Sequence, residues 1–237
     1  MQLRAVLFDV DFTIAKPGPD LGPEGYRRLG TRFGLELDPS RYDEARRHAV
    51  ATLERHPELD HDEEVWVLFT EQIIRGMGGN STRAYECAVE MTAAWEHAHN
   101  FDIYDDVLPT LASLREHRLK LGLVSNTGRD LEAFIAHHGL DVDAALSSGA
   151  HGKTKPHPTI FRAALDLLGV SATEAVMIGD SIEDDVHGAT AVGMRGLLLD
   201  RENRYPDVGE KLDDLRALPA ALGLAPGRKK PANRHIF

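Results

Sequence analysis

The sequence predicts an α/β protein with a doubly wound parallel sheet and an inserted bundle of helices. The first observation is that helices and strands alternate from about residue 101 onward, which is typical of a parallel sheet covered on both faces. The second is an apolar strand at residues 3–8. The third is that residues 16–99, between these parts, show only helical spacing. Together they indicate a Rossmann-like core whose first strand is separated from the others by a helical insertion.

The first strand ends in the apolar run AVLF, which is typical of a strand buried on both faces of its sheet. Asp9, Asp11 and Thr13 follow this run almost directly. An unpaired carboxylate is costly to bury. The two acids therefore either lie in a solvated turn or have a positively charged group beside them.

The helical block contains four amphipathic segments with apolar residues at three- and four-residue spacing. They cover residues 22–33, 39–56, 61–77 and 82–98. Four helices in succession with no strand between them predict a small bundle, which we assign to residues 16–100. We expect its aromatic residues, Trp66, Phe69 and Trp95, in the interior of the bundle.

In the second half of the chain, expected helices alternate with expected strands. The expected helices cover residues 107–118, 129–139, 157–169 and 183–193, and the expected strands cover residues 119–125, 143–149, 174–180 and 195–200. We therefore expect residues 1–15 and 101–225 to form the core. Residues 226–237 are rich in basic residues and proline, show no periodicity, and are expected to be a flexible tail.

The composition is that of a soluble globular protein, with 237 residues of which 42% are hydrophobic and 27% are charged. The formal net charge of −11 argues against a nucleic-acid partner, which requires a basic face. The single cysteine, Cys87, cannot form an internal disulfide and is expected to be a packed thiol. The sequence has no apolar run of membrane-spanning length and no signal-peptide pattern. We expect a cytoplasmic monomer or homodimer without a membrane partner.

Polar side chains gather at the carboxyl ends of the expected strands, where open α/β sheets bind their ligands. The strand at 119–125 ends in Ser125 and is followed by Asn126, and the strand at 174–180 ends in Asp180. Lys155 lies in the loop before a helix that is expected to begin near Pro158. A parallel sheet brings these side chains to the same edge as the two acids that follow the first strand.

The charges expected at this edge do not balance. Asp9, Asp11 and Asp180 bring up to three negative charges, and Lys155 returns one positive charge. A divalent cation would resolve the deficit, and oxygen ligands without His or Cys favour Mg²⁺ over zinc. Because Mg²⁺ held by few carboxylates usually keeps positions for water and phosphate, phosphoryl chemistry is the expected class.

Four short motifs carry a resemblance to a known family of enzymes. They are DVDFT at residues 9–13, Ser125 in LVSNT, Lys155 in KPHPTIF, and GDSIEDD at residues 179–185. In these motifs, and in their order, the chain resembles the haloacid dehalogenase (HAD) superfamily of phosphohydrolases, in the subgroup with a helical cap inserted after the first motif. The resemblance covers about residues 2–200. The chain departs from it at Phe12, where the family often has Gly, and at His157, where it often has Asp.

The resemblance implies a magnesium-dependent phosphomonoester hydrolase that acts on a small phosphorylated metabolite through an aspartyl-phosphate intermediate. Asp9 would be the nucleophile, and Asp11 would protonate the leaving group and then activate a water molecule. Ser125, Asn126 and Lys155, together with Asp9, would bind the transferring phosphoryl group. To act as an acid, Asp11 must carry a proton, and we expect the neighbouring negative charges to favour it.

The same resemblance assigns Mg²⁺ to the side chains of Asp9 and Asp180 and to the backbone carbonyl of Asp11. Three further residues are expected to support the site from behind these ligands: Thr13, Asp184 and Asp185. Contacts to the rest of the substrate are expected from basic residues of the helical block. The candidates are Arg46, Arg47, His48, Arg75 and Arg83, most of which are expected on solvated helix faces.

Several alternatives stay open at this point. A phosphomutase would use the same set of residues, whereas a 2-haloacid dehalogenase of the same superfamily would need neither an acid at Asp11 nor a metal. A non-catalytic regulatory protein could accept a phosphoryl group on Asp9. Lys153 is an alternative to Lys155, which we favour because Pro156 follows it.

Overall fold

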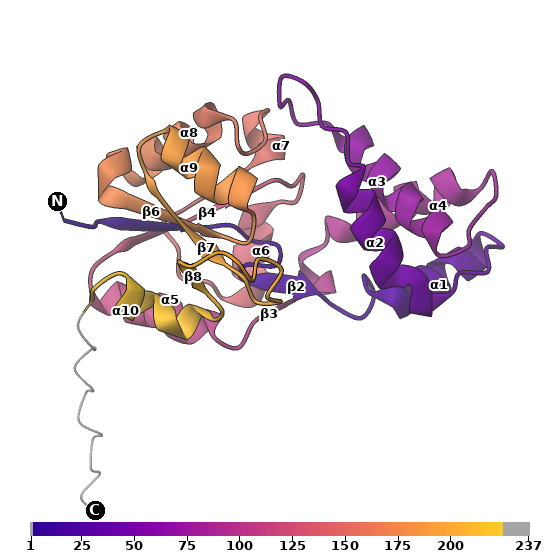
Figure 1. Cartoon of the computed structure of the whole chain (residues 1–237), viewed down its shortest axis with the longest axis horizontal. Helices are drawn as coiled ribbons and strands as arrows, with labels where there is room; N and C mark the ends of the chain where they lie inside the picture. Colours follow the sequence, from indigo (N-terminus) through magenta and orange to yellow (C-terminus); the bar gives the residue numbers. More distant parts are fainter. Residues whose placement is uncertain (1, 225–237) are drawn as a thin grey trace, which may run out of the picture.

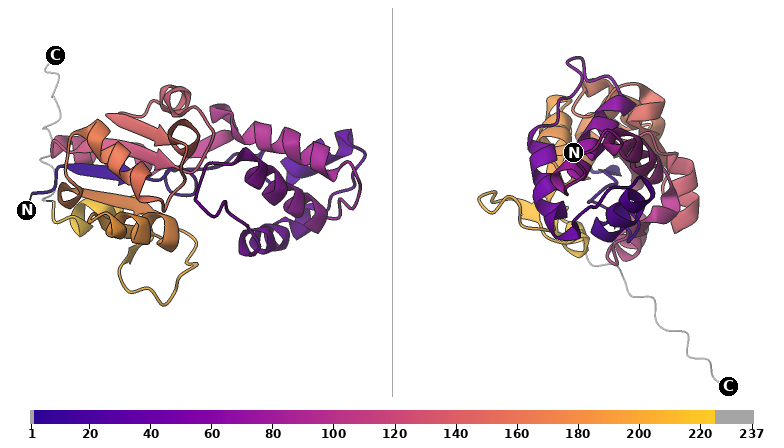
Figure 2. Two further views of the ribbon diagram at one scale, coloured as in Figure 1. Left: turned by 90° about the horizontal axis from the view of Figure 1, so that it is seen from above. Right: turned by 90° about the vertical axis from the view of Figure 1, so that its right-hand side faces the viewer.

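The structure, a computed structural model, describes residues 2–224 and has two parts joined by a narrow ribbon. One part is an α/β core, and the other is a body of four helices (Figure 1). Figure 2 shows that the two parts lie end to end along the long axis. The tail expected at 226–237 lies outside the described residues.

The core contains a six-stranded sheet in the order β5-β4-β1-β6-β7-β8, in which all neighbouring strands are parallel. The strands are β1 (Ala5–Phe8), β4 (Lys120–Ser125), β5 (Ala144–Ser147), β6 (Ala175–Gly179), β7 (Arg195–Leu199) and β8 (Lys211–Leu212). The expected doubly wound parallel sheet is therefore confirmed, and β8 is an addition to it. Because β1 lies between β4 and β6, its carboxyl end adjoins theirs.

Helices cover both faces of the sheet (Figure 1). One face carries α5 (Val107–Glu116), α6 (Leu131–His138) and α10 (Leu218–Ala221), and the other carries α8 (Pro158–Leu168) and α9 (Gly188–Ala191). A short helix, α7 (Ser148–His151), follows β5 directly. Along β1, Val6 and Phe8 pack into the first of these layers, whereas Ala5 and Leu7 pack into the second. Burial on both faces explains why this strand is a continuous apolar run.

The helical body consists of α1 (Pro23–Arg32), α2 (Tyr42–Ala51), α3 (Glu63–Gly76) and α4 (Ala84–Trp95). It is flanked by two short strands, β2 (Ala15–Pro17) and β3 (Phe101–Ile103), which pair in antiparallel orientation. The division into a core and a cap at residues 15/16 and 100/101 remains our proposal, and the position of this ribbon supports it. Within residues 2–224, no helix is both long and apolar enough to cross a membrane.

Two of the expected helices are wrong in their extent. In place of a helix over 39–56, the structure has a single 3-10 turn, η1 (Pro39–Arg41), then α2, then a loop over residues 53–62. This loop contains Pro57, and the residue before a proline avoids helical backbone angles. The helix expected over 183–193 is divided into η4 (Ile182–His187), whose turns are of the wide π type, and α9.

Two neighbouring leucines of α8 test the packing of the core. Leu168 is 2% exposed and packs toward Gly122 of β4, whereas Leu167 is 60% exposed. We expect Leu168→Ala to lower the free energy of unfolding by about 2–5 kcal/mol, because it removes buried methyl groups and leaves a cavity. Leu167→Ala is the matched control and should change the same quantity by less than about 0.5 kcal/mol. Urea unfolding followed by circular dichroism measures both, and equal losses would contradict the packing described here.

Candidate active site

The carboxyl ends of three adjacent strands bring the expected site residues together. Asp9 follows β1, Ser125 is the last residue of β4, and Asp180 follows β6. Asp9 and Ser125 are buried, and Asp180 is partly buried. The rule that neighbouring parallel strands end at one edge thus places these side chains as expected, while their chemical roles stay predictions.

Lys155 lies between two carboxylates in the interior of this site. Its Nζ donates a hydrogen bond of 2.6 Å to Oδ1 of Asp9 and one of 2.7 Å to Oδ1 of Asp185. Burial raises the pKa of Asp9 well above its usual range, and the charge of Lys155 opposes this rise. Burial alone would lower the pKa of Lys155, but Asp185 and Asp9 outweigh it and hold that pKa above its ordinary value. Lys155 therefore stays charged and pairs two buried acids.

The neighbouring lysine takes no part in this cluster. Lys153 forms an ion pair of 2.6 Å with Asp60 and donates a hydrogen bond of 2.9 Å to the carbonyl of Glu58. Both partners belong to the loop over 53–62 of the helical body. The structure therefore places Lys155, and not Lys153, beside Asp9.

Asn126 holds the backbone of Lys155. Its Oδ1 accepts a hydrogen bond of 2.6 Å from the amide of Lys155, and its Nδ2 donates one of 3.0 Å to the carbonyl of Lys155. The family resemblance predicts that Asn126 binds the phosphoryl group, but in the structure its side-chain amide faces the lysine loop. The loop then leads into α8, which begins at Pro158 as expected, with His157 as its N-cap.

Three carboxylates form an acidic cluster at the ends of β1 and β6. Asp9, Asp180 and Asp185 each place one oxygen within 4.8 Å of the others, and among residues 2–224 this is the one such group with metal-ligand potential. Burial, followed by the charge of Asp185, raises the pKa of Asp180 to about 6, although Arg204 donates a hydrogen bond of 2.6 Å to its carboxylate. The carboxylate of Asp185, which was expected to support the site from behind the ligands, lies within this cluster, and its role there stays a prediction.

The close approach of Asp185 depends on Gly179, the last residue of β6. A Cβ at position 179 would lie 2.1 Å from Cγ of Asp185, so any larger residue would displace this carboxylate. The other oxygen of Asp185 accepts a hydrogen bond of 3.0 Å from the amide of Ser181. Both oxygens of Asp185 are thus held, one by Ser181 and one by Lys155.

Asp184, the neighbour of Asp185 on η4, points toward the helical body. Nη2 of Arg55 donates a hydrogen bond of 2.9 Å to Oδ2 of Asp184, and Nη1 contacts the other carboxylate oxygen. Nη1 also lies 3.4 Å from the carbonyl of Lys155. Arg55, on the loop over 53–62, is therefore a link between the two parts of the protein that no motif in the sequence predicts.

The surroundings of Asp11 differ from those expected. Its two carboxylate oxygens accept hydrogen bonds of 3.0 and 3.2 Å from the guanidinium of Arg129, so its hydrogen-bonded partner is a cation rather than further acids. The next residue, Phe12, has a φ of +63°, in the left-handed region that favours glycine. This backbone turn explains why glycine suits the position. The hydroxyl of Thr13 is buried without a hydrogen-bond partner in the described chain, and its carbonyl accepts from Arg201.

The candidate substrate contacts of the helical body separate into two groups. Arg46 lies over the ring of Phe12, 5.3 Å from its centroid, and lines a small pocket together with Asp180 and Arg204. The other four line neither of the two pockets described for the protein: Arg75 pairs with Glu71 and Arg83 with Glu86, while Arg47 and His48 are exposed. Among the five candidates, Arg46 is the one that lines a pocket with Asp180 of the acidic cluster.

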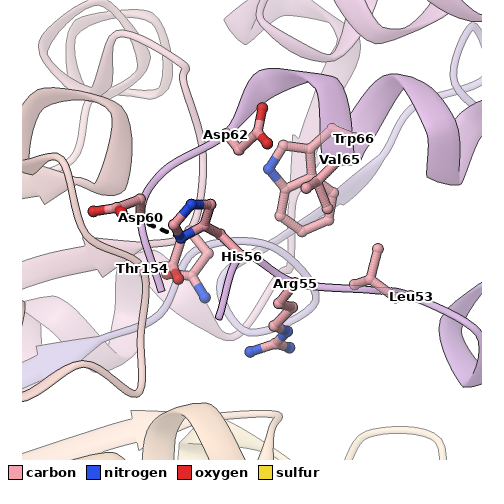
Figure 3. Close-up of a pocket in the computed structure, with 9 residues that line it drawn as sticks. Leu53, Arg55, His56, Asp60, Asp62, Val65, Trp66 and Thr154 are labelled. Atoms are coloured by element: carbon pink, nitrogen blue, oxygen red, sulfur yellow. Dashed lines mark ion pairs between the residues drawn. The ribbon is translucent and has the colours of Figure 1, made fainter. Parts of the chain in front are cut away.

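A second pocket lies between the helical body and the core, beside the lysine loop (Figure 3). Trp66 and Asp62 of the helical body face His56 and Thr154 across it. Asn126, the residue that holds Lys155, also lines it. The pocket thus lies next to the predicted phosphoryl site.

Comparison with known proteins identifies the family. A family model for haloacid dehalogenase-like hydrolases matches residues 3–193. The glyceraldehyde 3-phosphate phosphatase of Methanopyrus kandleri is 30% identical over 233 residues, with 90% of each chain covered. The phosphoserine phosphatase of Thermus thermophilus is 35% identical over 158 residues, which covers 62% of this chain and 61% of that protein.

A solved structure gives the same result. The crystal structure of a HAD phosphatase from Thermococcus onnurineus matches with a TM-score of 0.64 and 30% identity, covering 93% of this chain and 98% of that one. The chain therefore belongs to the haloacid dehalogenase-like hydrolase family. The sequence-based resemblance and the expectation of an enzyme are confirmed, and the comparisons support the predicted class, a HAD-like phosphatase.

The buried ion pairs of Lys155 predict how its substitution changes the free energy of unfolding. Lys155→Met leaves Asp9 and Asp185 buried without their cation, and we expect it to lower the free energy of unfolding by about 3–5 kcal/mol. Lys153→Met removes a lysine two positions away whose ion pair is near the surface, and it should cost less than about 1 kcal/mol. Urea unfolding at pH 7 with no added divalent metal measures both. An equal loss in the two variants would contradict the assignment of Lys155 to a buried ion cluster.

The burial of Cys87 predicts that its thiol reacts slowly in the folded protein. It is 1% exposed on α4, and burial, followed by the charge of Glu90, raises the pKa of its thiol from 9.0 to about 11. A raised thiol pKa means that the reactive thiolate is scarce at neutral pH and makes up half of the thiol only near pH 11. We therefore expect slow reaction of the folded protein with a disulfide reagent at pH 8, and fast reaction after unfolding in urea. A fast reaction of the folded protein would show that this thiol is accessible and ionised.

Proposed function

We propose that the protein is a magnesium-dependent phosphomonoester hydrolase that acts on a small phosphorylated metabolite. The observation that carries the proposal is the cluster at the carboxyl ends of β1 and β6. There Lys155 pairs with Asp9 and Asp185, and Asp180 adds a third carboxylate. Membership of the HAD-like hydrolase family and the named phosphatases among its relatives support the same reaction class.

The acidic cluster fits a divalent cation. Three carboxylate oxygens lie within 4.8 Å of one another. Burial, and after it the charge of Asp185, raises the pKa of both Asp9 and Asp180, although Lys155 and Arg204 oppose the rise, so negative charge on these groups is costly here. Oxygen donors alone favour Mg²⁺ over softer metals. Asp9, Asp180 and Asp185 would hold the ion, together with the backbone carbonyl of Asp11, and the bound ion would neutralise this charge and polarise the phosphoryl oxygens.

Asp9, Asp11 and Lys155 then have separate roles in the hydrolysis of the phosphoester. A carboxylate oxygen of Asp9 attacks phosphorus, and the bond from phosphorus to the leaving oxygen breaks. Asp11 donates its proton to that oxygen, which leaves as an alcohol. Asp11 then takes a proton from a water molecule that attacks the phosphoryl group on Asp9, which restores the Asp9 carboxylate and releases phosphate. Lys155, charged and 2.6 Å from Asp9, would orient the nucleophile and stabilise negative charge on the phosphoryl oxygens.

The alternatives predict different products. A phosphomutase would return the phosphoryl group to a second substrate molecule and release little free phosphate. A 2-haloacid dehalogenase would release halide, and it would need neither an acid at Asp11 nor a metal. The acidic cluster around Lys155 favours the hydrolase over the dehalogenase.

Phosphate release from a panel of phosphomonoesters tests the proposal. The panel should include sugar phosphates, phosphoglycolate, phosphoserine and nucleotides. We expect release from at least one compound in the presence of Mg²⁺, and a fall of at least ~100-fold when the metal is removed by a chelator, because charge stabilisation by a metal is worth several kcal/mol.

Two variants provide the controls. Asp9→Asn should lower phosphate release to background, because an amide is a much weaker nucleophile than a carboxylate. Asp166→Asn, on an exposed position of α8, should leave it unchanged. Release that persists in Asp9→Asn, or that does not depend on Mg²⁺, would refute the proposed mechanism.

A further inference from the structure

Arg129 is a buried cation whose contacts join the predicted acid to the helical body. Its side chain is 1% exposed, in the turn between β4 and α6. Nη1 and Nη2 each donate a hydrogen bond to one oxygen of Asp11, at 3.0 and 3.2 Å. This two-point contact fixes the plane of the carboxylate as well as its position.

Two further contacts fix Arg129 to the base of the helical body. Nε donates a hydrogen bond of 3.0 Å to the carbonyl of Trp95, the last residue of α4. The guanidinium lies over the ring of Phe101, the first residue of β3, 3.7 Å from its centroid, and within 5.4 Å of the ring of Phe134 on α6. A single side chain thus contacts Asp11, the end of the last helix of the body, and the ribbon through which the body joins the core.

We propose that Arg129 is the positioning residue for Asp11 and that it makes the orientation of this carboxylate depend on the position of the helical body. The inference rests on the proposed function, because it takes Asp11 to be the proton donor. If α4 and β3 move, the carbonyl of Trp95 and the ring of Phe101 move with them, and the guanidinium follows. A buried guanidinium that lost its carboxylate would be left unpaired at high cost, so Asp11 moves together with Arg129.

The consequence for the reaction is that the placement of Asp11 for proton transfer depends on the position of the helical body. A structural ion pair would stabilise the fold without affecting proton transfer. The two roles are separated by the leaving group of the substrate. An alkoxide needs a proton to depart, whereas 4-nitrophenolate departs without one, so that only the first depends on a well-placed acid.

The experiment compares Arg129→Met and Arg129→Lys with the unchanged protein on two substrates, 4-nitrophenyl phosphate and the best alkyl phosphate of the panel. The quantity measured is kcat/KM, which includes the steps up to departure of the leaving group and excludes hydrolysis of the phosphorylated Asp9. We expect kcat/KM for the alkyl phosphate to fall about 100-fold in Arg129→Met, and that for the nitrophenyl ester to fall less than about fivefold.

Arg129→Lys serves as the second test if Arg129→Met fails to fold. We expect it to fold because lysine preserves the buried positive charge. It lacks the planar fork, so the alkyl phosphate should again be affected far more than the nitrophenyl ester. The matched control is Arg115→Met, which removes a guanidinium bonded to Asp141 and Asp143 away from the site, and which should leave both values unchanged.

The outcomes distinguish the inference from the function on which it rests. An equal fall with both substrates, or no fall with either, while phosphate release still requires Asp9, would overturn the inference alone. Release that continues in Asp9→Asn, measured alongside, would overturn the proposed function and this inference together. A selective loss with the alkyl phosphate in both Arg129 variants supports the positioning role.

Discussion

The acidic cluster of the site depends on the buried positive charge of Lys155, which lies between two carboxylates. Unpaired, Asp9 and Asp185 would repel each other and would be costly to bury at the adjoining ends of β1 and β6. The surrounding structure is arranged to maintain this pairing. Asn126 holds both backbone polar groups of Lys155, and Gly179 leaves room for Asp185 to approach. The sheet brings the acids together, and the loop before α8 supplies the cation.

The buried strands and the acids that follow them could be predicted from the sequence, because both depend on local residue patterns. The apolar runs AVLF and AVMIG are buried strands, and the acids that follow them lie where a parallel sheet puts them. The ends of helices were less predictable, because they depend on tertiary contacts. In α2 the helix ends before the loop that reaches the core, and in η4 neighbouring acids must turn toward Lys155 and toward Arg55.

The partners of the site residues could not be predicted in the same way. Arg129 is separated from Asp11 by 118 positions, and Arg55 from Asp184 by 129 positions, so no spacing in the sequence connects them. In the sequence, Arg129 and Arg55 belong to polar segments, and no motif distinguishes them from the other arginines of the chain. Their importance follows from contacts across the fold and, for Arg129, also from burial. For this reason the acids of the site were found from their motifs, whereas the cations that orient two of them were found from the structure.

The central place of β1 has a consequence for folding. This strand is the first part of the core to be synthesised, yet its two neighbours, β4 and β6, begin at Lys120 and Ala175. Until those residues leave the ribosome, an apolar strand with two free edges has no partner, and pairings across such long stretches of chain form slowly. The helical body lies entirely between β1 and β4 in sequence, and its contacts are mostly local. It can therefore fold before the sheet closes, which shortens the effective distance between the first strand and its partners.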